Sequence, residues 1–162
     1  MSILSDEHFP DLGSWSEQEV RSVGYHRCSV SVFDHWLTPE EASACSFLSY
    51  HDAVSAGLSE AYEAQELRFL SFYQTLFAEG VYRRAGVGRT KTSATFHQGW
   101  DRRLKKDVKR SLRDHRHMDV YIPALSLRIA GSWDRSDALL FENAELMPAV
   151  AALAVSHGLF II

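Results

Sequence analysis

Cysteine is scarce in this sequence. Only Cys28 and Cys45 occur among 162 residues, too few for the disulfide framework of a small secreted domain or for a four-cysteine zinc site. Cys28 falls in a strand-like stretch and Cys45 in a helical one, so we interpret both as small buried side chains. Two residue pairs, His26 with Cys28 and His115 with His117, lack the further ligands that a zinc site needs. We therefore expect no disulfide, no metal and no cofactor.

A long apolar run is also lacking. Residues 146–155 are apolar without interruption, but Ser156, His157 and Gly158 follow, and the run is shorter than the ~18 residues expected of a membrane-spanning helix. The first basic residue is Arg21, so no positively charged start precedes an apolar segment as it does in a secretory signal. The sequence thus predicts a soluble, cytoplasmic protein without a membrane partner.

What is present is an ordinary globular composition. Hydrophobic residues make up 46% of the chain and charged residues 23%, far from the composition of disordered segments. A chain of this length can bury roughly 68–70% of its unfolded surface. No repeat or linker divides it. We predict one domain over residues 1–162, with residues 1–20 forming an irregular N-terminal segment that is packed down by Phe9 and Trp15.

Alternation of polar and apolar residues predicts several strands. Residues 25–33 alternate as in a half-buried strand, and residues 81–98 suit two short strands joined by a turn. In residues 119–130 the apolar positions change parity at Pro123, which we interpret as one long strand with a bulge or an edge position. Residues 131–137 are then a hairpin loop.

The end of the sequence predicts two further strands. Residues 138–141 form the returning strand of that hairpin. Residues 159–162 show no polar alternation, so we expect a strand that is covered on both faces and lies inside the sheet. Deleting these four residues is then expected to leave an insoluble or unfolded chain.

Helical patterns begin at a strong start signal. Thr38, Pro39 and Glu41 suit an N-cap, a first helical position and a capping box, which predicts a helix running to about residue 57. A broad apolar face at 3.6-residue spacing predicts helix over residues 59–79, either as a continuation or as a restart.

Two more helices complete the expected fold. Residues 101–117 carry only a narrow apolar stripe of Leu104, Val108 and Leu112, which is typical of a helix on the surface. Residues 146–157 form the last helix. The sequence therefore predicts an α+β domain in which a mostly antiparallel sheet packs against three to four helices.

Positive charge is concentrated in one stretch. From Arg83 to Arg116, twelve basic residues stand against three aspartates, a net of +9, while the other five basic and eighteen acidic residues give the rest of the chain −13. A protein polarised in this way can attract a polyanion to its positive side.

Aromatic residues are interleaved with these charges. Tyr82, Phe96 and Trp100 would suit stacking on unpaired bases, while the basic helix follows phosphates. We therefore predict a protein that contacts a polyanion, nucleic acid above all, through residues 82–116. The predicted site consists of Arg83, Arg84, Arg89, Lys91, Trp100, Arg102, Arg103, Lys105, Lys106, Lys109, Arg110, Arg113 and Arg116.

The same charges have structural explanations. Arg103 with Asp107 and Arg110 with Asp114 are helix pairs that would neutralise part of a merely solvated face. The basic helix can also pack against the acidic stretch of residues 39–79. We expect that replacing Lys105, Lys106, Lys109 and Arg113 costs little stability if they are exposed. A large loss would indicate internal pairing, and these alternatives stay open.

Two other functions remain possible from the sequence. The protein can be an interaction module, such as an inhibitor or an immunity-type partner, whose acidic body makes the contact. It can also be a metal-independent nuclease in which His97 is the general base near Arg89, Lys91 and Arg102.

Two polar loops have a simpler explanation. Residues 83–92 contain Gly-x-Gly among basic residues but lack the spacing of a nucleotide-binding P-loop. Residues 132–137 combine two aspartates with an arginine, which can support acid–base chemistry. Asp and Ser also form tight turns, however, and we interpret both loops as turns.

Overall fold

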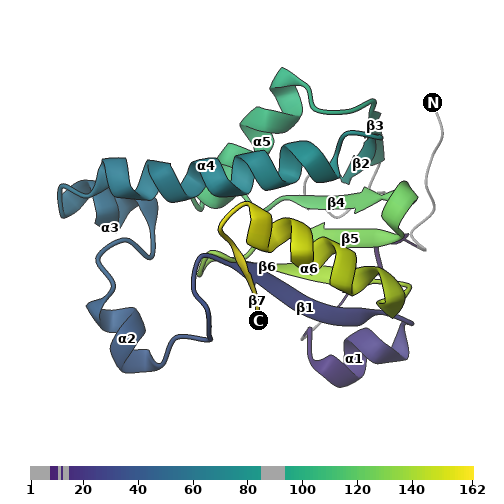
Figure 1. Ribbon diagram of the computed structural model, residues 1–162, viewed down its shortest axis with the longest axis horizontal. Helices are drawn as coiled ribbons and strands as arrows, with labels where there is room; N and C mark the ends of the chain where they lie inside the picture. Colours follow the sequence, from purple (N-terminus) through teal and green to yellow (C-terminus); the bar gives the residue numbers. More distant parts are fainter. Residues whose placement is uncertain (1–7, 11, 13–14, 85–93) are drawn as a thin grey trace.

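An antiparallel sheet forms the centre of the computed structural model, which describes residues 8–10, 12, 15–84 and 94–162. Its seven strands follow the order β3-β2-β4-β5-β6-β1-β7, and every neighbouring pair is antiparallel (Figure 1). The strands are β1 (His26–Ser31), β2 (Val81–Arg84), β3 (Ala94–His97), β4 (Asp119–Ile122), β5 (Leu127–Ala130), β6 (Ser136–Phe141) and β7 (Phe160–Ile161).

Six α-helices accompany this sheet in the described part of the chain. The helices are α1 (Glu17–Ser22), α2 (Pro39–Ala44), α3 (Tyr50–Ser55), α4 (Ser59–Leu76), α5 (Arg102–Leu112) and α6 (Met147–Ser156). The three longest, α4, α5 and α6, share one hydrophobic core with the strands, and the three short helices lie at the periphery (Figure 1). The predicted α+β fold is confirmed. None of the helices described is both long and apolar enough to cross a bilayer.

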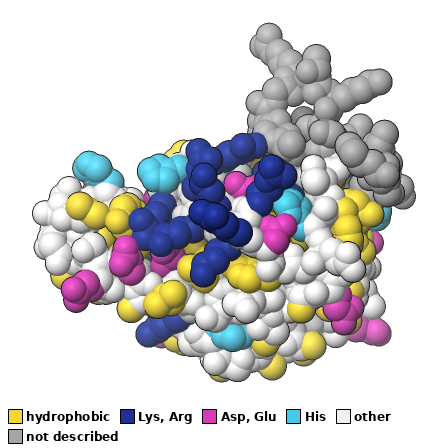
Figure 2. All heavy atoms as spheres, turned by 90° about the horizontal axis from the view of Figure 1, so that it is seen from above, with side chains coloured by type: hydrophobic (Ala, Val, Ile, Leu, Met, Phe, Trp, Pro, Cys, Tyr) yellow, Lys and Arg dark blue, Asp and Glu magenta, His cyan; other side chains and the backbone are white. Residues whose placement is uncertain are grey.

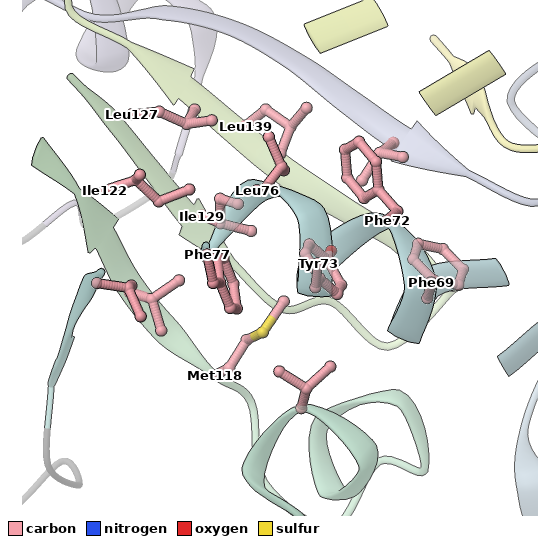
Figure 3. Close-up of a cluster of buried hydrophobic side chains, with 14 of the residues drawn as sticks. Phe69, Phe72, Tyr73, Leu76, Phe77, Met118, Ile122, Leu127, Ile129 and Leu139 are labelled. Atoms are coloured by element: carbon pink, nitrogen blue, oxygen red, sulfur yellow. The ribbon is translucent and has the colours of Figure 1, made fainter. Parts of the chain in front are cut away.

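The aromatic face of α4 supplies much of the core. Phe69, Phe72, Tyr73 and the following Phe77 are fully buried, and the ring centroids of neighbouring pairs lie 5.3–6.0 Å apart. Burial of each such side chain contributes about 1.5–3 kcal/mol. Figure 3 shows these rings together with the strand residues Ile122, Leu127, Ile129 and Leu139. This packing holds α4 against the sheet and fixes the position of its acidic residues.

The expected helix over residues 39–57 is interrupted. The capping box at Thr38 is present, but α2 ends at Ala44, and Cys45 has an extended backbone. A second start follows at Ser49, whose Oγ accepts a hydrogen bond from the Asp52 amide at 3.1 Å and caps α3. The N-terminal segment is also more regular than expected, because Ser16 caps α1 within it.

The expected long strand over residues 119–130 is wrong. β4 and β5 are two antiparallel strands joined by a 3₁₀ turn at Pro123–Leu125 and by Ser126, which has a φ of 44°. A strand reversal and a bulge both change the parity of the apolar positions, and the sequence pattern does not separate them. The hairpin loop that follows, between β5 and β6, forms as predicted.

The last strand lies at the edge of the sheet, not inside it. β7 pairs with β1 alone, and Phe160 is 41% exposed. Leu159, just before the strand, is buried in the main core. The apolar run at this end therefore divides into one core residue and an edge strand that is covered on one face.

Candidate polyanion-binding surface

Helix α5 is held by a narrow apolar stripe and a strong N-cap. Asp101 Oδ1 accepts a hydrogen bond from the Leu104 amide at 2.7 Å. Leu104, Val108 and Leu112 are buried, as the sequence predicted. Because one stripe is enough to dock the helix, the rest of its circumference remains open to other side chains.

Six cations on and just after α5 face solvent. In the described part of the chain, none of them forms an ion pair, and Figure 2 shows that lysine and arginine side chains gather on this face of the molecule. The six, called the exposed cations below, are Arg102, Arg103, Lys105, Lys106, Arg110 and Arg116.

The exposed cations repel one another along the helix. Lys106 has Arg102 and Arg110 four residues away, and Arg103 and Lys109 three residues away, so its neighbours on the helix surface are all basic. Like charges at these spacings destabilise a helix by about 0.2–0.5 kcal/mol per pair. The arrangement therefore works against the stability of the isolated helix.

Other predicted cations are engaged inside the fold. Arg113 donates hydrogen bonds from Nε to Glu66 at 2.6 Å and from Nη2 to Glu63 at 3.0 Å. Lys109 Nζ lies 3.2 Å from the same Glu66, which is only 2% exposed. The hydrogen bond to Glu66 raises the pKa of the Arg113 guanidinium, and that group also lies 3.9 Å from the ring centre of Tyr50. Internal pairing with the acidic stretch is therefore correct for these two cations.

Two more predicted cations, both on β2, bind aspartates of α5 and β4. Arg83 Nη1 lies 2.7 Å from Asp107, and Arg84 Nη1 lies 3.4 Å from Asp119. The expected pairing of Arg103 with Asp107 is wrong, because Arg83 on β2 occupies that carboxylate. The expected pairing of Arg110 with Asp114 does not form among the described ion pairs; burial raises the pKa of Asp114 to about 6.

The stability expectation from the sequence changes accordingly. The proposed replacement of Lys105, Lys106, Lys109 and Arg113 mixes two exposed cations with two partners of Glu66. The last two changes would leave a buried carboxylate poorly compensated, so this variant is expected to lose stability for reasons unrelated to binding.

The predicted aromatic contacts are only partly available. Trp100 is half-buried and packs on Phe77, with ring centroids 5.8 Å apart, so it belongs to the core and not to the basic surface. Tyr82 and Phe96 form a pair 4.8 Å apart, and Phe96 is 47% exposed. The remaining predicted residues, Arg89 and Lys91, lie outside the described residues.

His97 sits beneath the start of α5. Its side chain is 5% exposed, and Nδ1 lies 2.7 Å from Asp101 Oδ2. The other ring nitrogen, Nε2, is buried and has no hydrogen-bond partner among the residues that the structure describes. The helix-start hydrogen bond from Leu104, followed by the one with His97, lowers the pKa of Asp101. His97 is therefore bonded to the N-cap residue of α5. It presents no exposed ring nitrogen to a substrate phosphate.

A second concavity escaped the sequence interpretation. A cavity of about 480 Å³ is lined by Trp15, Trp36 and Trp133, together with Arg27 and His117. Trp133 belongs to the loop that we interpreted as a simple turn. The sequence signal for this cavity was Trp133 itself, which is 66% exposed. Asp and Ser are sufficient to form a tight turn, so the turn does not explain a tryptophan in this loop.

Neither metal chemistry nor resemblance identifies the site. Within the described ranges, no group of three or more His, Cys, Asp or Glu side chains could hold a metal ion. Comparison with models of protein families, with curated proteins and with solved structures gives no significant match. The functional argument therefore depends on the geometry of this chain.

Proposed function

We propose that the protein binds a nucleic acid through the exposed cations of α5. The observation that supports this most directly is the division of the basic residues. One group of cations forms ion pairs with Glu66, Glu63, Asp107 or Asp119 and so stabilises the fold. The six exposed cations lie close together and form no ion pair with any described residue.

The acidic excess of the remaining chain sharpens this contrast. A net charge of −13 outside residues 83–116 offers many possible partners, yet no carboxylate in the described part of the chain forms an ion pair with the exposed cations. A surface that keeps repelling charges together creates a local positive potential, which attracts polyanions and raises their association rate. A cytoplasmic location, where nucleic acids are abundant, is part of this proposal.

The dimensions of α5 suit a phosphate backbone. Arg102, Lys106 and Arg110 follow one another every four residues and form a row spanning about 12 Å along the helix. One strand of B-DNA rises about 3.4 Å per phosphate, so this row covers about three to four phosphates. The expected slope of log K against log salt lies between about −2 and −4.

A charge-matched pair of variants tests the proposal. Lys106→Gln with Arg110→Gln removes two exposed cations from α5, and Arg21→Gln with Arg68→Gln removes two exposed cations elsewhere. The first variant is expected to make the salt slope shallower by about 2 and to weaken binding to every sequence alike. The second is expected to change neither. Binding is measured by anisotropy of a labelled oligonucleotide over a salt series.

Two results would contradict the proposal. No binding to duplex or single strands at low salt would remove it. Equal weakening by the two variants would show that only net charge matters and not this surface. If the protein instead binds a protein partner, and neither variant changes that affinity, the interaction-module alternative is favoured.

A further inference from the structure

The cavity lined by Trp36 and Trp133 lies on the sheet face opposite α4, α5 and α6. Ala130 and Ala138 are register partners and point into it, whereas the intervening Ile129 and Leu139 point into the main core. A volume of about 480 Å³ falls within the roughly 300–1,000 Å³ of small-molecule sites.

Small side chains create this hollow. Ala130, Gly131, Ser136 and Ala138 line it where β5 ends and β6 begins. The core-facing positions of the same strands carry large apolar residues. These short side chains leave space above the sheet that can accept a planar group.

Two exposed tryptophans form the walls. Trp36 is 51% exposed and Trp133 is 66% exposed, and both border the cavity. Large aromatic rings with this much exposure gain little from the fold itself. Trp133 already contacts the His117 ring, and the surface that it and Trp36 leave exposed can stack on a second aromatic ring, which is how proteins hold unpaired bases.

Part of the polar lining is already engaged, because Arg84 and Arg128 pair with Asp119, and Asp134 accepts hydrogen bonds within its own turn. His117 and Arg27 keep hydrogen-bonding capacity. Both ring nitrogens of His117 are buried and lack partners among the described residues, and the ring meets Trp133 in a T-shaped contact with centroids 4.1 Å apart. Burial lowers the pKa of His117, so the ring is neutral near pH 7 and carries one donor and one acceptor. Arg27 donates one hydrogen bond, to the Trp15 carbonyl at 2.6 Å, and brings positive charge to the rim.

The basic surface and this cavity have neighbouring residues in common. A smaller hollow is lined by Arg110 and Arg116 from the exposed cations, and it shares His117 and Met118 with the larger cavity. Arg116 precedes His117 in the chain. Because α5 and the cavity lie on opposite faces of the sheet, a strand whose phosphates lie along α5 has to pass around the sheet next to residues 116–118 to reach the cavity.

We propose that the cavity holds the unpaired base of a single-stranded nucleic acid whose phosphates lie on α5. This inference rests on the proposed function and adds that the ligand is single-stranded, with one base stacked between Trp36 and Trp133. A duplex keeps its bases paired and can use the cations alone.

The test compares three probes and two matched variants. The probes are a single strand of about 12 nucleotides, a duplex of the same length and free adenosine monophosphate. Trp133→Ala removes one wall, and Phe160→Ala removes an exposed aromatic residue of β7 that does not line the cavity. Anisotropy follows the polymers, and quenching of tryptophan emission follows the mononucleotide.

Trp133→Ala is expected to weaken single-strand binding about ten- to hundredfold, the effect of losing one base stack, and to leave duplex binding unchanged. Trp36→Ala is expected to act in the same direction. Phe160→Ala should change neither, and the Lys106→Gln/Arg110→Gln variant should weaken both polymers.

The possible failures are distinguishable. If single-strand binding by both tryptophan variants equals that of the parent protein, the cavity proposal is overturned and the proposed function stands. If neither polymer binds but the mononucleotide quenches emission in a Trp133-dependent way, the α5 proposal fails and the base comes from a free nucleotide. If no probe binds, both proposals fail.

Discussion

The cations on and just after α5 form two sets, one paired with carboxylates and one exposed to solvent. Arg113 and Lys109 converge on the buried Glu66 of α4, whereas Lys106 and Arg110, one turn or less away, face solvent among other positive charges. The paired set docks α5 against α4, and the exposed set adds nothing to that docking. Charge content alone therefore does not define a binding surface, because part of it is consumed by the fold. Stability and binding should respond to different residues of α5.

The largest effect is expected from breaking the paired set. Arg113→Met leaves Glu66, which is 2% exposed, with Lys109 as its remaining cation. Removing one partner of a buried ion pair typically costs about 3–5 kcal/mol, and we expect about 3 kcal/mol because Lys109 remains. Arg110→Met, one turn earlier and exposed, should cost less than about 1 kcal/mol. Urea unfolding of both variants measures the contrast, and equal losses would mean that the two sets do not differ.

A buried carboxylate in the sheet extends the comparison to pH. Asp137 accepts hydrogen bonds from the Tyr73 hydroxyl and the Ser132 amide, and burial raises its pKa to about 6. The folded state thus holds this proton more tightly than the unfolded state, where the pKa is close to 3.9. Its contribution to the free energy of unfolding rises as the pH falls from about 7 to 4, by about 2 kcal/mol.

Asp137→Asn should abolish this gain. The amide keeps the shape and can still accept from the Ser132 amide, but it has no proton to gain. Relative to the parent protein, the variant is expected to be more stable at pH 7 and to lose that advantage by pH 4. Urea unfolding at several pH values gives the difference directly. A difference that does not vary with pH would show that Asp137 titrates as an ordinary exposed carboxyl group.

The smallest effect is expected within the exposed set. Lys106→Gln removes repulsion from basic neighbours on both sides, so it should stabilise the protein by a few tenths of a kcal/mol at low salt. At high salt the gain should vanish, because exposed charges are screened. Lys105 is the comparison, since Asp101 four residues before it offsets part of the repulsion from Arg102 and Lys109, so its replacement should stabilise the protein less. A loss of stability in Lys106→Gln would reveal an unrecognised partner.

Local signals in the sequence were reliable where one segment decides the outcome. Thr38 and Glu41 form the predicted capping box, and Leu104, Val108 and Leu112 form the predicted buried stripe. The sequence misled us where one pattern fits two geometries. The parity change at Pro123 is compatible with a reversal of the chain between two strands as well as with a bulge in one strand. An apolar run such as residues 159–162 is compatible with an edge strand as well as with a central strand.

The candidate site was less predictable because its contacts are distant in sequence. Glu66 and Arg113 are separated by 47 residues, and no periodicity indicates which acidic residue will neutralise which basic one. Trp36 and Trp133 likewise come from segments that only the sheet brings together. Sequence reasoning located the charged stretch but could not divide it into structural and exposed cations.

The position of β7 has a consequence for the behaviour of this protein in concentrated solution. Its two residues and the mutual backbone hydrogen bonds between Ser29 and Ile162 cover the outer side of β1 from Ser29 to Ser31. A six-residue strand with open amides and carbonyls would be a template for pairing with a second copy. The short last strand therefore acts as a cover that limits self-association. Removing residues 160–162 would be expected to promote assembly through β1 even while Leu159 keeps the core intact.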